Sequence, residues 1–411
     1  MVKEWRIINL SKSSKIKARI GWQGLTTAEY LDEGYAFLVT GTDIKSGRVD
    51  WANCHFVTYE RYAQDQNIQI ANGDLLLSKD GTIGKVALVS NLNRPATLNS
   101  GVFVIKPIND DYETNYMFYV LESFIFKDFL GQLSAGSTIN HLYQKDIVKF
   151  ECALPPINEQ RRIATALLSI DETIDSLRKK LNKYRELREG CLQEMFPQRG
   201  KRLPVRRFPE YKREWKECSL GSITNIFSAA RVHKEDWTNS GVPFFRSSDV
   251  MAALNGTTNE KAYISEDLYE KLSLVSGKLE KGDVLVTGGG SIGNPYIVPD
   301  NKPLYTKDAD LLWVKRNNGI DPYFIYTFFF TPAFREYLLS ISHVGTIAHY
   351  TIEQLKKTPI MLPEITEQIS IGNLFKDLDA TIKLQYRELK KYENIKQGMM
   401  EELLTGKVRL V

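Results

Sequence analysis

The chain has 411 residues, enough for two or three domains that each bury a core of their own. Its formal charge of +4 and pI near 8.6 agree with an anionic partner but do not require one. The four cysteines are far apart and the N-terminus does not resemble a signal peptide, so we expect reduced thiols and a cytoplasmic protein. The most apolar stretch, residues 323–339, contains a proline and two charged residues. It therefore fails as a membrane span and is expected to form a core helix.

The sequence contains an internal repeat. Residues 154–196 align without gaps on residues 362–404, with 14 identities in 43 positions. Shorter motifs in the preceding segments match at nearly the same offset: Gly81-x-x-Gly84 with Gly290-x-x-Gly293, and Thr138-Ile139-x-His141 with Thr346-Ile347-x-His349. A variable segment followed by a helical one is thus used twice, which predicts a pseudo-two-fold architecture instead of a solenoid of short units.

Each variable segment is predicted to contain strands joined by glycine-rich turns. A Gly-Asp-x-Leu strand is followed by Gly-x-Ile-Gly at residues 73–84 and again at residues 282–293. The second run satisfies G-x-G-x-x-G, but Asn294-Pro295 follows it where a dinucleotide site needs a helix. We therefore interpret both runs as hairpin turns. No H-E-x-x-H motif or cysteine cluster is present, so no metal site is predicted.

Each repeat is predicted to end in a long helix of about 38 residues, on the order of 55 Å. Prolines at 155, 156 and 363 precede the helices, and Pro197 ends the first one. Apolar residues recur at alternating spacings of four and three, which is typical of a coiled-coil seam. The seam residues are Ile163, Leu167, Ile170, Ile174, Leu177, Leu181 and Tyr184 in the first copy, and Ile371, Phe375, Leu378, Ile382, Gln385, Leu389 and Tyr392 in the second.

The partner of each apolar stripe is expected to be the other copy. The long segment between Pro197 and Pro363 allows the chain to return, so we expect antiparallel helices with the variable domains at opposite ends. Gly190 and Gly398 each cost about 1 kcal/mol relative to alanine inside a helix, and we expect close approach of the two backbones there. For Gln385 two interpretations stay open, a buried polar group that fixes the register and an ordinary surface residue.

This layout resembles the specificity subunits of type I restriction-modification systems across essentially the whole chain. Residues 154–160 (LPPINEQ) and 362–368 (LPEITEQ) are similar to the beginnings of that family's two spacer helices, and the Gly-Asp-x-Leu and Gly-x-Ile-Gly segments are similar to its target-recognition domains. The resemblance implies an α+β fold, with two mixed α/β target-recognition domains separated by two long antiparallel coiled-coil helices. The expected segments are target-recognition domain 1 (1–153), the first spacer helix (154–198), a linker with target-recognition domain 2 (199–361) and the second spacer helix (362–411).

The resemblance also implies a function. Such a subunit binds a bipartite asymmetric site on double-stranded DNA, one half per domain. Two methyltransferase (modification) subunits with S-adenosylmethionine and two restriction subunits using ATP and Mg would supply all catalysis, so this chain is expected to carry no cofactor and no catalytic residue, and to have no membrane partner. The alternatives are a stand-alone DNA-binding protein without a methyltransferase partner and a single-chain enzyme, for which the catalytic motifs are not found.

Reading DNA requires side chains that reach base edges and cations that hold phosphates. The candidates in the first domain are Lys12, Lys15, Lys17, Arg19, Thr40, Thr42, Ser78, Lys79, Thr138 and Asn140. Those in the second domain are Arg231, Lys234, Arg246, Ser247, Ser248, Thr287, Ser291, Thr346 and His349. A solvated loop or a structural turn is the open alternative for each group. The basic linker at residues 199–208 has the same two interpretations, phosphate contact or solvated connection.

Overall fold

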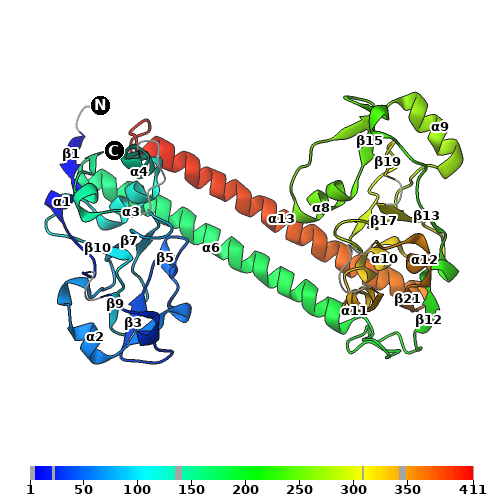
Figure 1. Cartoon of the computed structure of the whole chain (residues 1–411), viewed down its shortest axis with the longest axis horizontal. Helices are drawn as coiled ribbons and strands as arrows, with labels where there is room; N and C mark the ends of the chain where they lie inside the picture. Colours follow the sequence, from blue (N-terminus) through cyan, green and yellow to red (C-terminus); the bar gives the residue numbers. More distant parts are fainter. Residues whose placement is uncertain (1–4, 21–23, 135–140, 308–309, 342–348, 411) are drawn as a thin grey trace. The chain divides into compact units, whose positions relative to one another are not determined.

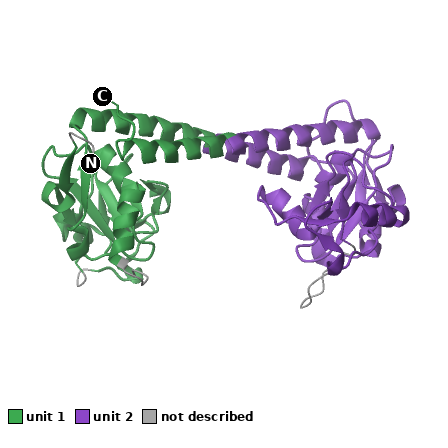
Figure 2. Ribbon diagram, turned by 90° about the horizontal axis from the view of Figure 1, so that it is seen from above, with its two compact units in different colours: residues 1–177, 388–411 green, residues 178–387 purple. Residues whose placement is uncertain are grey.

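The computed structural model describes residues 5–20, 24–134, 141–307, 310–341 and 349–410. The chain divides into two compact units, residues 1–177 with 388–411, and residues 178–387 (Figure 2). The division falls inside both long helices, so each unit contains one α+β domain together with a part of each helix. The segment boundaries predicted from the sequence lie at the ends of these helices instead, and stay a prediction.

The domain of the first unit combines two small sheets with short helices (Figure 1). An antiparallel sheet has the order β2-β10-β7-β8, a second sheet has the order β6-β3-β9 with β3 and β9 parallel, and β1 pairs with β11. The strands are β1 (Arg6–Asn9), β2 (Ser14–Lys17), β3 (Ala36–Val39), β4 (Ile44–Lys45), β5 (Arg48–Val49), β6 (His55–Val57), β7 (Leu75–Ser78), β8 (Val86–Leu88), β9 (Ala96–Leu98), β10 (Val102–Pro107) and β11 (Glu151–Leu154). The helices are α1 (Leu10–Ser13), α2 (Tyr59–Ala63), α3 (Thr114–Glu122), α4 (Phe124–Ser134), α5 (Gln144–Ile147) and the long α6 (Ile157–Glu194).

The domain of the second unit has a similar strand topology, with one additional edge strand in its second sheet and, among the described residues, no counterpart of the β4-β5 pair. Its sheets have the orders β13-β20-β17-β18 and β14-β16-β15-β19, with β15 and β19 parallel, and β12 pairs with β21. The strands are β12 (Lys216–Ser219), β13 (Ile226–Phe227), β14 (Trp237–Thr238), β15 (Val242–Phe245), β16 (Ala262–Ile264), β17 (Val284–Thr287), β18 (Pro295–Ile297), β19 (Tyr305–Thr306), β20 (Leu311–Val314) and β21 (Pro359–Leu362). The helices are α7 (Leu220–Ile223), α8 (Ser247–Asn255), α9 (Glu266–Ser276), α10 (Pro322–Phe328), α11 (Pro332–Ile341), α12 (Ile352–Lys357) and the long α13 (Ile365–Leu403).

The two domains share the order of their main strands, so the predicted α+β fold and internal repeat are confirmed. The predicted hairpin turns are confirmed as well, since β7 pairs with β8 and β17 with β18 across them. Gly81, Gly84, Gly290 and Gly293 all have positive φ in these turns, a conformation that favours glycine. The apolar stretch at 323–339 forms two helices, α10 and α11, instead of the single expected one, because the helix ends before Pro332. Among the described residues no helix is long and apolar enough to cross a membrane.

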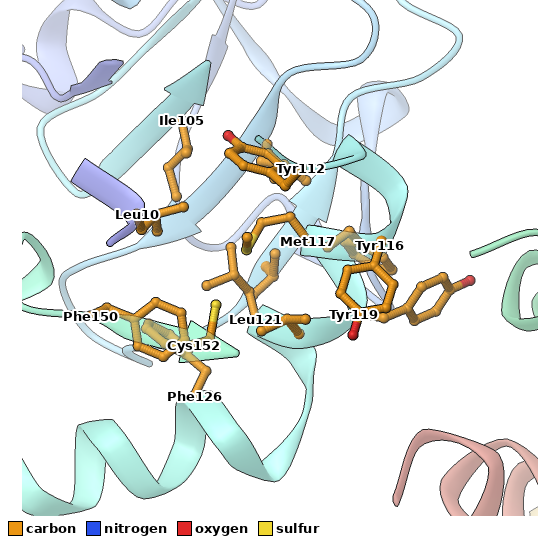
Figure 3. Packing of buried hydrophobic residues seen from close by; sticks show 14 of the residues in the cluster. Leu10, Ile105, Tyr112, Tyr116, Met117, Tyr119, Leu121, Phe126, Phe150 and Cys152 are labelled. Atoms are coloured by element: carbon orange, nitrogen blue, oxygen red, sulfur yellow. The ribbon is translucent and has the colours of Figure 1, made fainter. Parts of the chain in front are cut away.

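A continuous hydrophobic core joins the first domain to the long helices within its unit. Side chains of α3 and α4, including Tyr116, Met117 and Phe126, lie against Phe150 and Cys152 (Figure 3). The same cluster contains residues of α6 and of the end of α13: Ile163, Ala164, Leu167, Leu403 and Leu404. In the other unit, a second cluster joins the second domain to the long helices through Leu192, Met195, Phe196, Ile371 and Phe375. Each domain is therefore fixed to the parts of α6 and α13 in its own unit by apolar burial.

The Glu-Gln pair at the start of each long helix makes contacts that explain the repeated motif. Gln160 donates from Nε2 to the Pro155 carbonyl at 2.9 Å and accepts from the backbone N–H of Glu113 at 2.9 Å. Gln368 does the same with Pro363 and with the backbone N–H of Asp321. Both glutamines are buried, so these bonds satisfy backbone groups that water cannot reach.

Two matched aspartates connect each domain to the helix pair. Each accepts a hydrogen bond from a tyrosine of its own domain and faces a cation on the other long helix. Asp171 accepts from Tyr119 at 2.7 Å and lies 2.9 Å from Lys396 Nζ. Asp379 accepts from Tyr323 at 2.9 Å and lies 2.5 Å from Arg188 Nε. In each unit the earlier part of one helix meets the later part of the other, so the predicted antiparallel pairing is confirmed.

The seam positions are mostly buried. Ile170, Tyr184, Ile382 and Tyr392 are half-buried, and the other ten seam residues are buried. Gln385 is among the buried ones, which excludes the surface interpretation of this residue.

The expectation for Gly190 and Gly398 is wrong. A Cβ atom at either position would have no neighbouring atom within 4 Å, because neither glycine lies where another part of the chain approaches.

Candidate nucleic-acid interface

In the first unit, the ends of several strands meet at one edge of the domain. The backbone N–H of Lys79, directly after β7, donates to the Gly101 carbonyl at 2.9 Å, and its carbonyl accepts from Leu142 at 2.8 Å. A Cβ atom at Gly41, two residues after β3, would lie 3.6 Å from the Cβ of Ser78. Two of the predicted DNA-contact segments, at residues 40–42 and 78–79, are thus brought together beside Leu142, although they are far apart in the sequence.

The second unit assembles the same edge from the matching residues. The backbone N–H of Gly288, directly after β17, donates to the Asp310 carbonyl at 2.8 Å, and its carbonyl accepts from Tyr350 at 2.8 Å. Ser247, at the start of α8, donates from its hydroxyl to the same Asp310 carbonyl at 2.9 Å. We refer to the two regions, residues 40–42, 78–85, 99–101 and 141 and residues 246–248, 287–294, 307, 310 and 349, as the strand-end edges.

Charged side chains gather at the first strand-end edge. Asp80 contacts His141 through Nδ1, and Lys79 Nζ lies 3.5 Å from Asp80 Oδ2 and 3.4 Å from His141 Nε2. The Asp80 and His141 side chains are 38% and 32% exposed, so both remain accessible to a ligand. Lys85 Nζ lies 3.5 Å from the Gly41 carbonyl. At the second edge, Lys307 Nζ lies 2.5 Å from Asp310 Oδ2.

A family model for the type I restriction modification DNA specificity domain matches residues 26–184 and 212–394 of this chain. The chain belongs to this specificity family. The type I restriction enzyme MjaVIII specificity subunit of Methanocaldococcus jannaschii is 23% identical over 362 residues, which cover 84% of this chain and 81% of the relative. The putative type I restriction enzyme MjaX specificity subunit of the same organism is 24% identical over 408 residues, 94% of this chain and 90% of the relative.

A solved structure shows the same fold. The S subunit of a type I restriction-modification system from M. genitalium is similar with a TM-score of 0.63 and 16% identity, over 97% of this chain and 96% of that chain. Several of the predicted DNA contacts lie at the strand-end edges of this fold.

Two predicted contacts of the specificity-family domains instead close hairpin turns. Ser78 is buried, donates to the Thr82 carbonyl at 2.6 Å and accepts from the Lys85 backbone N–H at 2.9 Å. Thr287 is buried in the same way and donates to the carbonyl of Ser291. Their hydroxyls are occupied inside the protein, so we remove both from the candidate DNA contacts. The side chain of Ser291 itself is exposed at the turn.

The polar residues after β3 and β15 differ in their surroundings. Thr40 bonds to Thr42 at 2.7 Å and to the Asp43 carboxylate at 2.8 Å, and Thr42 is exposed. Arg246 is paired with Asp249 at 3.0 Å and is only 20% exposed, so its charge is largely compensated. Ser248 is exposed and accepts from Asn259 at 2.8 Å.

The four basic candidates near the N-terminus, at residues 12, 15, 17 and 19, do not form a single surface patch. Arg19 is buried, and its guanidinium donates to the Leu98 carbonyl at 2.8 Å and to Thr97 at 3.2 Å. Burial lowers the pKa of Arg19. It therefore stabilises β9 internally and is unavailable to a phosphate. The exposed Lys12 and Lys15 lie towards the far end of the β2-β10 pair, since Lys15 is opposite Lys106 while the strand-end edge is next to Val102. Lys17 is half-buried nearer the edge.

The remaining candidates divide into exposed residues and residues outside the described ranges. Arg231, Lys234 and His349 are exposed. Thr138, Asn140 and Thr346 lie outside the residues that the structure describes.

The basic linker is partly used inside the second unit. Arg207 makes a two-bond pair with the buried Glu367 at 2.6 and 2.7 Å, which raises the pKa of Arg207. Arg206 pairs with Glu194 at 2.6 Å. These two arginines hold the linker to the long helices, which favours a structural role for this end of the linker.

Asp80, His141, Lys307 and Asp310 were not among the predicted DNA contacts, although Asp80 and His141 directly follow predicted ones in the sequence. The matched Thr-Ile-x-His motifs were the signal for His141, since His349 was chosen from the same motif. The aspartates gave no such signal because they do not align with each other. Within the described parts of the chain, no group of three or more His, Cys, Asp or Glu residues is arranged to hold a metal ion.

Proposed function

We propose that this chain is the DNA-binding specificity subunit of a type I restriction-modification complex, and that it reads a bipartite asymmetric site on double-stranded DNA with one unit per half-site. The observation that carries the proposal is the duplication: two domains of the specificity family, each with its own strand-end edge of accessible charged and polar side chains. Because loop residues differ between the edges, the two half-sites are expected to differ as well.

In this proposal the chain itself carries no catalysis and no cofactor. Two methyltransferase subunits, which bind S-adenosylmethionine, and two restriction subunits, which use ATP and Mg, would act on the DNA that this chain selects in the cytoplasm. Support comes from the relatives, which are named specificity subunits of type I restriction enzymes. The paired long helices, fixed to both domains by apolar cores, are the proposed docking surface for the methyltransferase subunits.

Methylation-site mapping tests the proposal. The chain is co-expressed with a candidate adenine methyltransferase subunit from its own genome, and the methylated sites are read from the host DNA. We expect one split motif with an unread spacer of roughly six base pairs, because the centres of the two half-sites should be about one turn of 10 to 10.5 base pairs apart and the half-sites themselves take up part of that turn. Replacing residues 1–150 by the first domain of another family member should change one half of this motif. A change of both halves together, or no association with the methyltransferase, would contradict the proposal.

A further inference from the structure

The two strand-end edges carry the same pair of chemical groups on different strands. Residues 79, 80 and 101 of the first unit correspond to residues 288, 289 and 310 of the second, because the backbone bond from Lys79 to Gly101 is repeated from Gly288 to Asp310. At these matched positions the first unit has Asp80 and Gly101, whereas the second has Gly289 and Asp310. The aspartate and the glycine have therefore exchanged strands between the repeats.

The exchanged carboxylates occupy nearly the same space. A Cβ atom added to Gly289, where the first unit has Asp80, would lie 2.8 Å from Asp310 Oδ1 and 3.8 Å from His349 Nδ1. In the first unit, a Cβ atom at Gly101 would lie 3.7 Å from Asp80 Oδ2. In the first unit the carboxylate contacts the histidine of the Thr-Ile-x-His motif, and in the second unit Asp310 Oδ1 and His349 Nδ1 both lie within 4 Å of the same added Cβ atom.

The hydrogen-bonding geometry of the first unit defines what the carboxylate does. An aspartate accepts, so His141 Nδ1 must carry the proton that it donates to Asp80. Lys79 has only donors, so Nε2 on the other side of the ring is the acceptor that faces Lys79 Nζ at 3.4 Å. The ring of Tyr143 lies 4.4 Å from the imidazole and covers one of its faces. These contacts from three directions fix the orientation of the ring at the accessible edge.

We propose that Asp80 is a positioning residue that orients His141 so that Nε2, once released from Lys79, accepts a hydrogen bond from DNA, and that Asp310 supplies the same carboxylate near His349 in the other half-site. This inference rests on the proposed function and names the residues through which each strand-end edge contacts DNA. A purely structural pair would not need to keep the carboxylate at one point in space while the residue that carries it moves to another strand. Because Nε2 is an acceptor, its target is a hydrogen-bond donor on a base edge, such as the amino group of adenine or cytosine.

The exchange itself provides the experiment. The complex assembled with its methyltransferase is titrated with a duplex that contains its mapped site. Asp80→Gly should weaken binding about tenfold, in the range that one well-placed hydrogen-bonding group contributes. Adding Gly101→Asp to this variant should restore most of the affinity, since it places the carboxylate as in the second unit and Gly101 has room for a side chain. Asp310→Gly with and without Gly289→Asp is the mirror experiment. Asp110→Ala is the matched control, because this exposed aspartate follows the opposite end of β10.

Two further measurements separate positioning from folding. Asp80→Ala/His141→Ala should bind no more weakly than either single variant, because Asp80 acts only through the histidine. Thermal unfolding should differ little between Asp80→Ala and Asp110→Ala. Asp80→Gly should show a smaller penalty for base changes in one half-site, whereas a lower salt dependence with an unchanged base preference would indicate a phosphate contact and contradict the assignment.

The outcomes also distinguish this inference from the proposed function. If the unmodified complex does not discriminate half-sites, the proposed function itself fails. If it does discriminate and Asp80→Gly binds as tightly as the unmodified complex, the positioning role is refuted. The same holds if the folded exchange variant binds no better than Asp80→Gly. Should the exchange variant not fold, additive losses in Asp80→Ala/His141→Ala would refute the role.

Discussion

Lengthening both long helices should lengthen the unread part of the DNA site. Arg188 pairs with Asp379, and Lys396 pairs with Asp171, so one step forward along α6 corresponds to one step back along α13. Leu181, seven residues before Arg188, therefore faces the region of Tyr386, seven residues after Asp379. The repeat alignment alone would match Leu181 with Leu389. We accordingly place the two insertions after Leu181 and after Gln385, where they face each other.

Four helix-forming residues inserted at both points add about 6 Å to the helix pair. DNA rises by about 3.4 Å per base pair, so the spacer should grow by one or two base pairs. Both half-sites should stay the same, because neither domain is altered. Methylation-site mapping of this variant beside the unmodified protein measures both features. An unchanged spacer with full methylation would refute the reasoning that these helices set the spacing.

The single insertion is the control for this experiment. Four residues added to α6 alone should shift buried seam residues such as Leu181 away from their partners. Losing the packing of even one buried leucine costs about 2–5 kcal/mol. We therefore expect a clear fall in unfolding temperature for the single insertion and a much smaller one for the matched pair.

Arg409→Met should lower the free energy of unfolding by about 3 kcal/mol, because it leaves the buried Glu159 without its two-bond partner. Adding Glu159→Gln should recover most of this loss. Urea unfolding that shows the double variant no more stable than Arg409→Met would contradict this. The hydrogen bonds from Arg409 lower the pKa of Glu159. This pair should therefore stabilise the folded protein fully above about pH 5 and lose its contribution as the pH falls through that lowered pKa. Measuring the free energy of unfolding of the unmodified and doubly substituted proteins across pH 3–6 checks the direction of this pH dependence. Gly190→Ala and Gly398→Ala should each stabilise by up to about 1 kcal/mol, since the new methyl groups meet open space, and a destabilised variant in thermal unfolding would be inconsistent with that space. The isolated chain should transfer no methyl group from S-adenosylmethionine to DNA, and labelled product from the purified chain would refute its non-catalytic role.

The long-range organisation could be predicted because it is repeated in the sequence. Apolar spacing and flanking prolines are local signals, and they placed both long helices close to their observed ends at Ile157–Glu194 and Ile365–Leu403. The antiparallel pairing followed from the length of the segment between them. The facing register did not, because it depends on single ion pairs such as Arg188 with Asp379 that no periodic pattern encodes.

The repeated Glu-Gln motif shows a second limit of prediction from the sequence. From the sequence, Glu159 and Glu367 are helix N-terminal residues that suit the positive end of the helix dipole. In the structure each is buried against an arginine from a distant segment, Arg409 or Arg207. The local pattern gave the correct position of the glutamate, while its partner could only be found once the chain was folded.

The candidate DNA contacts differ in predictability for a physical reason. Hydroxyl groups beside a glycine turn, such as those of Ser78 and Thr287, first satisfy the backbone groups of that turn, because an unpaired buried N–H or carbonyl costs about 1–3 kcal/mol. Side chains that remain at the edge must therefore extend beyond the turn, and their orientation has to come from another strand. Asp80 and Asp310 meet this requirement from two different strands, so alignment of the repeats separates them although the fold places them at the same point. A search for further DNA-reading residues in this family should accordingly compare positions in space across β7, β10, β17 and β20, and not columns of an alignment.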